Sequence, residues 1–414
     1  MPFIVEHKIL VITSTYPRWP GDTIPGFVHE LCRRLTRYFN IHVITPHYPG
    51  AKRVEVIDGV QIHRYRYAPA SLERLAGEDS ILSVLKSRPW MGALVPAFLI
   101  GQTLAVARLI RKVNPAAIHA HWIVPGGVCA RLGRVLSGRH TPILLTSHGA
   151  DLFTLRGMIT SRIKRWAIEG AAASTVVSEA MRQKLADLNP ESIVYVRSMG
   201  VDYEHTFRCD KSEERRNSCR IIFAGRLVEK KGVKHLIHAF RLISASNPDL
   251  ELVIIGDGPE RVSLERLTSD LSLGNRIRFL GERPQSFIAE AFCSATIAVF
   301  PFVIASDGDQ EGLGLVVPEA MGCGCAVIAG DVPAVHDSIE DGVSGYLVNS
   351  ANERYLAERI GKLVCDPDER RSLAETASAR ARARFGWPAV ANHYRDILDS
   401  VLIPAPAPNK SGSI

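Results

Sequence analysis

Cysteine is sparse in this chain, and its pattern excludes two classes of protein. The eight cysteines stand at positions 32, 129, 209, 219, 293, 323, 325 and 365, with no CxxC pair and no repeated spacing. Zinc sites and disulfide frameworks usually show such spacings, so neither is indicated. We therefore expect reduced thiols in a cytoplasmic protein.

Long apolar runs are also rare. The start, "MPFIVEHKILVITSTYP", lacks the unbroken apolar stretch of a signal peptide, and we expect a buried strand there. Residues 89–107 carry no charge and approach the length of a membrane span, but they include two prolines, two glycines, Gln102 and Thr103. A membrane span is therefore the least favoured interpretation. A buried core helix and a helix lying on a membrane face are equally favoured.

Acidic side chains are scarce in the first half of the chain. Residues 1–206 contain 25 Lys and Arg against 15 Asp and Glu, whereas the remainder contains 25 against 28. An excess of positive charge suits nucleic acid, an anionic membrane surface or a phosphorylated substrate. Because no basic motif interleaved with aromatic residues is present, we expect no nucleic-acid partner.

Short β-branched runs alternate with helix-length segments along the whole chain. Examples are "KILVIT", "IHVIT" and "PILLTS" in the first half and "RIIFAG", "ELVIIG" and "TIAVF" in the second. Fully apolar strands of this kind indicate parallel sheets covered by helices on both faces. The 414 residues exceed what one core usually supports. The sequence predicts an α/β fold with two doubly wound, Rossmann-like domains facing across a cleft.

The pattern restarts near residue 219, after a polar connection. We expect an N-terminal domain over residues 1–203 and a C-terminal domain over 204–386. A helix at 387–403 is predicted to pack back on the first domain, and the Pro-rich tail 404–414 to be disordered. Ligands of such folds bind beyond the carboxyl ends of the strands, so chemistry is expected in the cleft.

The stretch "IIFAGRLVEKKGVKHLIHAF" reads as a strand, a loop and a helix. Arg226 lies at the strand end, and Lys231 precedes Gly232 near the helix start. Two cations beside a helix N-terminus suit a diphosphate. A solvated basic loop is the alternative.

The stretch "EGLGLVVPEAMGCG" places Glu311 and Glu319 eight positions apart, about 12 Å if the chain between them is helical. Carboxylates accept hydrogen bonds from sugar and ribose hydroxyls, and Gly312 and Gly314 would let the backbone approach a ligand. The alternative is a helix with two solvated acids.

These two stretches, with "GDGP" at 256–259 and "SHGAD" at 147–151, resemble the retaining GT-B glycosyltransferases of group 1, or family 4. The resemblance covers nearly the whole chain. It implies transfer of a sugar from a nucleoside-diphosphate sugar to a hydroxyl acceptor with retention of configuration. It also implies a donor-binding C-terminal domain and an acceptor-side N-terminal domain.

The resemblance carries roles over to particular residues. Arg226 and Lys231 match the cations on the donor diphosphate, Glu319 matches the ribose-binding glutamate, and Glu311 matches the glutamate near the donor sugar. The turn formed by Gly312, Leu313 and Gly314 matches the backbone that contacts sugar and phosphate.

In the N-terminal half, the resemblance implies a histidine beside the donor sugar. His148 is favoured over His121, although a histidine at a strand end is often structural. The first loop, with Gly21, Asp22 and Gly26, is expected near the phosphates and the acceptor. A surface loop is an equal alternative there.

The "DGD" at 307–309 has the spacing of a metal-binding D-x-D. Since Arg226 and Lys231 already supply positive charge, we expect no required metal and no cofactor. Relatives often read "NGVD" where this chain has "MGVD", so no site is assigned at Met199.

The acceptor is expected to be a lipid-linked or polysaccharide precursor, reached by peripheral contact of the basic N-terminal domain with the inner face of the membrane. A small soluble acceptor is the alternative. Rival functions are a sugar-nucleotide epimerase, a phosphorylase of the glycogen type and, outside the enzymes, a membrane-binding module.

Overall fold

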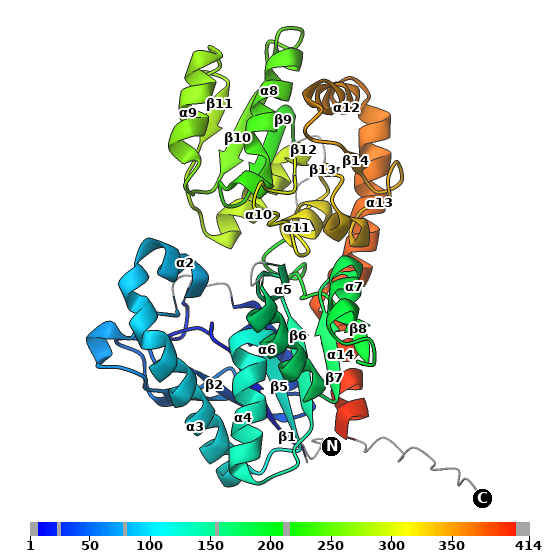
Figure 1. Ribbon diagram of the computed structural model, residues 1–414. Coiled ribbons are helices and arrows are strands. Elements are labelled where there is room, and N and C mark those ends of the chain that lie inside the picture. Colours follow the sequence, from blue (N-terminus) through cyan, green and yellow to red (C-terminus); the bar gives the residue numbers. More distant parts are fainter. Residues whose placement is uncertain (1–6, 23–25, 78–80, 154–156, 210–215, 403–414) are drawn as a thin grey trace, which may run out of the picture.

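The computed structural model describes residues 7–22, 26–77, 81–153, 157–209 and 216–402. Two α/β domains stand one above the other, and the last helix returns from the upper to the lower domain (Figure 1). The fold-class prediction is confirmed. The expected tail at 404–414 lies outside the described residues.

Within the described residues, the lower domain is built on an eight-stranded sheet in the order β3-β4-β2-β1-β5-β6-β7-β8. Its strands are β1 (Lys8–Ile12), β2 (Asn40–Pro46), β3 (Val54–Ile57), β4 (Val60–Tyr65), β5 (Ala117–His121), β6 (Ile143–Ser147), β7 (Ala173–Val176) and β8 (Val194–Val196). All neighbouring strands are parallel except β3 and β4. The prediction of a wholly parallel sheet is therefore wrong at this edge. Asp58 and Gly59, both at positive φ, make the tight turn of an antiparallel hairpin.

The helices of the lower domain form two layers. They are α1 (Phe27–Leu35), α2 (Ile81–Ser87), α3 (Val95–Val113), α4 (Val128–Ser137), α5 (Ala150–Phe153), α6 (Met158–Glu169) and α7 (Glu179–Leu188). Short helical turns lie at Ala70–Leu72, Pro89–Leu94 and Ile123–Gly127. Helices α3, α4 and α6 cover one face of the sheet, and α1 shares the core on the other face with the returning C-terminal helix.

The upper domain has a six-stranded sheet in the order β11-β10-β9-β12-β13-β14, with every described pairing parallel. Its strands are β9 (Asn217–Ala224), β10 (Glu251–Ile255), β11 (Ile277–Phe279), β12 (Ala295–Phe300), β13 (Ala326–Gly330) and β14 (Tyr346–Val348). Its helices are α8 (Val233–Ser244), α9 (Arg261–Asp270), α10 (Gln285–Ser294), α11 (Val316–Gly322), α12 (Glu353–Cys365) and α13 (Pro367–Phe385), with short turns at Glu229–Lys231 and Pro333–Asp337.

The chain crosses between the domains twice, and the two crossings lie side by side. The Val201 N–H donates to the Phe385 carbonyl at 2.7 Å, and Val201 forms a bridge with Gly386. After this point α14 (Trp387–Leu402) packs on α1 and the sheet of the lower domain. The buried Met199 side chain lies in the same apolar cluster as Trp387.

The expectation of reduced thiols throughout is wrong at two positions. Cys209, at the start of the upper domain, forms a disulfide with Cys293 of α10. The two residues are 84 positions apart, so no short spacing in the sequence predicts the pair. The other six cysteines, all within the described residues, are not part of a disulfide.

Gly200 makes the crossing sensitive to substitution. A Cβ built on Gly200 would lie 2.3 Å from Cδ2 of the Trp387 ring, whereas a Cβ on the exposed Gly274 would meet nothing within 4 Å. We expect Gly200→Ala to lower the free energy of unfolding by about 1–3 kcal/mol through overpacking. Gly274→Ala should leave it nearly unchanged. Thermal unfolding of the two variants compares them directly, and equal midpoints would contradict this account of the crossing.

Candidate active site

A cavity of about 540 Å³ lies between the two domains. Its walls come from the loop after β1, the start of α1, the crossing near Gly200, the start of α10 and the α11 region. These segments follow the carboxyl ends of β1, β11 and β12, which is where ligands of doubly wound folds bind. The cavity is therefore the candidate active site.

Lys231 and Glu311 of the upper domain form an ion pair that does not line this cavity, but the Lys231 charge acts on Glu319, which does line it. Lys231 Nζ donates to Glu311 Oε2 at 2.5 Å, and the two side chains are only 13% and 14% exposed. The Lys231 ammonium also lies 4.6 Å from the centre of the Phe302 ring. Burial acts to raise the pKa of Glu311, but the charges of Lys231 and Lys230 lower it overall. The structure thus brings two predicted site residues together as a charged, shielded pair.

Arg226 contacts the lower domain. Its Nη1 donates to Ser83 Oγ of α2 at 3.0 Å, so the side chain reaches across to the lower domain. Arg226 lies two residues after the end of β9, and Lys231 ends the turn before α8, as the sequence indicates. The Arg226 guanidinium is thus placed as an interdomain contact.

Glu319 lies on α11 and lines the cleft. Burial, opposed by the charge of Lys231, raises the pKa of Glu319 to about 7. The helix begins only at Val316, so the assumption of a helical chain from Glu311 to Glu319 is wrong for its first part. The backbone between them instead forms a glycine-containing turn, with Gly314 at a φ of 70° and Leu313 buried.

This turn presses against the lower domain. A Cβ on Gly312 would lie 3.2 Å from the His148 carbonyl oxygen, and a Cβ on Gly149 would lie 3.3 Å from the Gly312 Cα. The absence of side chains lets the two backbones meet. Residues predicted to contact the donor sugar from opposite domains are therefore neighbours.

His121 and His148 form a stacked pair. His121 Nδ1 and His148 Nε2 are 2.9 Å apart, and the rings are nearly parallel at 9°. Burial, the largest cause, and the neighbouring His119 lower the pKa of His148 to about 3. The pKa of His121 is also lowered, chiefly by burial. Both rings are therefore neutral near pH 7, and one donates to the other.

Sequence reasoning missed the groups that fix this pair. The buried Asp151 carboxylate accepts from Ser147 Oγ at 2.8 Å and from the Ile123 N–H at 2.6 Å, which ties the loop after β5 to the loop after β6. The Phe27 ring lies 5.0 Å from the His148 ring. Asp151 is the last residue of the "SHGAD" motif, but only the fold shows that its carboxylate bridges two loops.

The first loop is held by its own ion pair. Arg18 Nη2 lies 2.8 Å from Asp22 Oδ1, and the Asp22 side chain is almost fully buried. Gly21, Asp22 and Gly26 all line the cleft, as predicted for residues near an acceptor. The geometry gives Asp22 the task of shaping the loop.

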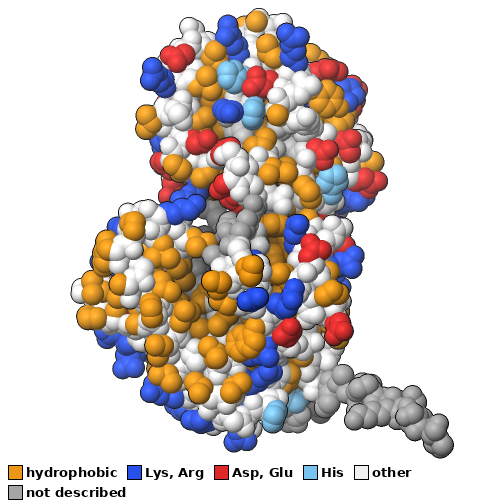
Figure 2. All heavy atoms as spheres, in the orientation of Figure 1, with side chains coloured by type: hydrophobic (Ala, Val, Ile, Leu, Met, Phe, Trp, Pro, Cys, Tyr) orange, Lys and Arg blue, Asp and Glu red, His pale blue; other side chains and the backbone are white. Residues whose placement is uncertain are grey.

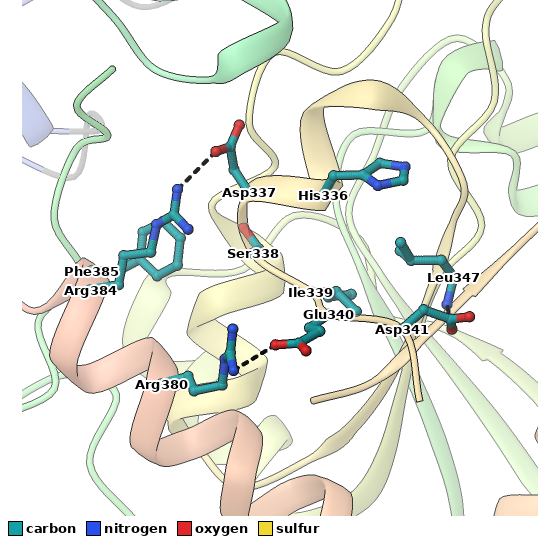
Figure 3. A pocket seen from close by; sticks show the side chains of 10 residues that line it. All are labelled: His336, Asp337, Ser338, Ile339, Glu340, Asp341, Leu347, Arg380, Arg384 and Phe385. Atoms are coloured by element: carbon teal, nitrogen blue, oxygen red, sulfur yellow. Dashed lines mark hydrogen bonds and ion pairs between the residues drawn. The ribbon is translucent and has the colours of Figure 1, made fainter. Parts of the chain in front are cut away.

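A second pocket, of about 420 Å³, contains none of the predicted site residues (Figure 3). Two ion pairs lie across it: Arg384 with Asp337 at 2.8 Å and Arg380 with Glu340 at 2.7 Å. Asp337 also accepts from the Glu179 N–H at the start of α7 at 2.7 Å. These contacts join α13, the turn at Pro333–Asp337 and the lower domain. We therefore interpret the residues of this pocket as structural.

The "DGD" aspartates contact each other and the turn before α8. Asp309 lies 3.1 Å from Lys230 Nζ, and Asp307 Oδ1 accepts from the Asp309 N–H at 2.8 Å. Among the described residues, the metal-type ligands that do cluster are Cys209, Cys293 and Cys323, and the first two of these form the disulfide.

Comparison with known proteins agrees with this geometry. Residues 26–205 match the family model described as Glycosyltransferase Family 4, and residues 208–380 match Glycosyl transferases group 1. The D-inositol 3-phosphate glycosyltransferase of Frankia alni is 30% identical over 75% of this chain and 81% of its own. The GDP-mannose-dependent alpha-(1-6)-phosphatidylinositol monomannoside mannosyltransferase of Mycolicibacterium smegmatis is 25% identical over 92% of this chain and 94% of its own.

Solved structures show the same fold. HepE of Anabaena, solved in complex with UDP-glucose, superposes with a TM-score of 0.70 at 18% identity, covering 95% of this chain and all of that one. The two matched family models together span both domains and every predicted site residue except Gly21 and Asp22. The chain belongs to the group 1 glycosyltransferases and is a glycosyltransferase of GT-B fold.

Proposed function

We propose that the enzyme transfers a sugar from a nucleoside-diphosphate sugar to a hydroxyl acceptor, with retention of configuration and without a metal ion. The main support is the contact of the Gly312 backbone with the backbones of His148 and Gly149. This contact brings the Lys231–Glu311 pair close to the histidine pair. Both relatives named above are glycosyltransferases, one of them GDP-mannose-dependent, and HepE binds UDP-glucose.

The charges of the cleft suit this donor. The donor diphosphate is anionic, and Lys231 with Arg226 would place positive charge beside it. When the bond to the sugar breaks, negative charge develops on the leaving diphosphate, which is where fixed cations stabilise the transition state most. Glu311, paired with Lys231, would orient that ammonium and accept hydrogen bonds from sugar hydroxyls.

The neutral histidines favour a same-face reaction. In this step the bond between the anomeric carbon and the diphosphate oxygen breaks, and the acceptor oxygen bonds to that carbon on the same face. The acceptor proton passes to the leaving diphosphate. His148, with a pKa of about 3, is too weak a base to take that proton near pH 7. Its role would be to hydrogen-bond the donor sugar.

The proposed acceptor half of the cleft is the loop after β1 and the start of α1, which line the cavity from the lower domain. A lipid-linked or polysaccharide precursor is the proposed acceptor, and a small soluble acceptor is the alternative. The mannosyltransferase relative acts on a phosphatidylinositol monomannoside, by its name, which supports the lipid-linked class.

Glu319 is expected to control nucleotide affinity. Hydrogen bonds to a charged group contribute about 1.5–3 kcal/mol, so Glu319→Ala should weaken binding of the cognate nucleoside diphosphate roughly 10- to 100-fold. Because its ionised form is the better acceptor and its pKa is about 7, affinity should fall as pH drops below 7. Calorimetric titration between pH 6 and pH 8 measures both effects.

The matched control is Glu319→Gln, titrated in the same buffers. Nucleotide phosphates also titrate near pH 6, and this variant retains that contribution while removing the carboxylate. An equal pH dependence in Glu319→Gln and in the wild type would show that Glu319 does not contact the nucleotide.

Glu311 is expected to act on turnover. Glu311→Ala should lower kcat roughly 100- to 1,000-fold, comparable with loss of one preorganised transition-state contact, while nucleotide affinity changes little. Steady-state kinetics with calorimetry separate the two effects, and Glu311→Gln keeps the side-chain volume. If Glu311→Ala and Glu319→Ala changed kcat and affinity in the same proportions, this division of roles would be wrong.

Metal removal is expected to leave turnover unchanged. Asp309 is already paired with Lys230, and the donor diphosphate would meet cationic side chains instead of a metal ion. Activity in EDTA, compared with activity in added magnesium or manganese, measures this. Loss of turnover in EDTA that either ion restores would refute metal independence.

A further inference from the structure

A broad apolar face covers one side of the lower domain. Hydrophobic side chains gather over α3, α4 and α6 (Figure 2). The large ones that are exposed there are Trp90, Ile100, Leu104, Leu132, Val135, Leu136, Met158, Ile159 and Ile163. We call this set the apolar face. Contiguous exposed apolar surface of this kind usually marks a binding surface.

The apolar face lies in a segment almost without acidic residues. Residues 81–168 contain twelve Lys and Arg and one acid, Asp151. Asp151 is 3% exposed and is used inside the domain by Ser147 and Ile123. The surface that this segment contributes therefore carries positive charge, and the excess is larger than the net charge of +7 of the whole chain.

The cations stand at the margins of the apolar face. Along α3, the exposed Ile100 and Leu104 are followed one turn later by the exposed Arg108. Arg139 comes just after α4, and Arg162 lies on α6 between exposed apolar neighbours. Long cationic side chains can lay their apolar stems on such a surface and extend their charges to a phosphate layer.

We propose that the apolar face is a docking surface for an anionic lipid bilayer. Apolar side chains would enter the interface between headgroups and acyl chains while the flanking Lys and Arg meet anionic headgroups. A second copy of the chain fits poorly, because a two-fold interface would bring two cationic margins together. The enzyme would then be peripheral to the membrane.

Helix α3, which carries part of the apolar face, lies along this surface and does not cross it. Among the described residues, the segment Pro89–Val113 is the one helix long and apolar enough to span a membrane. Its other side is built into the domain, since Phe98, Val106 and Ile110 are buried in the core over the sheet. The interpretation as a core helix thus holds for the inner side of α3, and the proposal assigns the membrane-facing interpretation to its outer side.

Docking would place the cleft at the membrane. The chain segment that leads into α3 begins with α2, whose Ser83 hydroxyl accepts from Arg226 of the upper domain. The lipid surface would therefore adjoin the interdomain contact beside the donor half of the cleft. This last step rests on the proposed function, whereas the docking itself does not.

Flotation tests the docking directly. The full chain is mixed with phosphatidylcholine vesicles, with or without phosphatidylglycerol, and floated on a density gradient. We expect binding to the anionic vesicles only, weaker at high salt because surface charges are screened. Ile100→Glu should abolish flotation, and Arg108→Ser should weaken it about fivefold, the typical contribution of one basic side chain near an anionic surface.

Matched controls lie on α9 of the upper domain. Val262 is 77% exposed and the Arg266 side chain is 84% exposed, so Val262→Glu and Arg266→Ser make the same chemical changes away from the apolar face. Both should float like the wild type, and nucleotide titration of all four variants shows that the cleft is intact.

Three results would overturn the proposal. The first is no flotation of the wild type with anionic vesicles, and the second is equal loss in the α9 controls. The third is a wild-type dimer that Ile100→Glu converts to a monomer without changing flotation, since the apolar face would then bind a second copy. A wild type that floats with anionic vesicles but binds no nucleoside diphosphate would count against the proposed function alone.

Discussion

The contact between the Gly312 backbone and the His148–Gly149 backbone is the constraint on which the site depends. A Cβ on either glycine would come within about 3.3 Å of the opposite backbone, so ordinary side chains would push the domains apart. With the contact made, the neutral histidine pair of the lower domain faces the turn that follows the Lys231–Glu311 pair. The twin crossings at Val201 and Phe385 keep the two halves in register from the far side.

Charge is divided across the cleft by environment as well as by sequence. Glu311 and Glu319 stand eight residues apart, yet Lys231 lowers the pKa of the first overall, while burial raises that of the second to about 7. One carboxylate is thus a fixed anion and the other titrates near physiological pH. The histidines, of which His121 is buried and His148 partly buried, contribute hydrogen bonds but no charge near pH 7. The positive charge of the cleft comes from Lys231 and, at the interdomain contact, from Arg226.

The sequence predicts the fold class because apolar strands and glycine-rich turns are local features. Lys231 and Glu311, which the sequence singles out through short motifs, are paired in the structure, and Glu319 lines the cleft. It misses the β3–β4 hairpin, whose strands alternate polar and apolar residues, and the Cys209–Cys293 disulfide, whose partners are far apart in the chain. The roles of Asp151 and Asp22 also escape it, because hydrogen bonds between loops depend on how those loops fold. The apolar face emerges only when three helices are placed side by side.

The proposed donor site binds a nucleoside diphosphate through Lys231. Calorimetric titration of UDP, GDP and ADP into the wild type and into Lys231→Ala, all in EDTA, is the most direct test. We expect the wild type to bind one of the three nucleotides and Lys231→Ala to lose most of that affinity. No binding of any nucleotide, or equal binding by Lys231→Ala, would contradict this proposal.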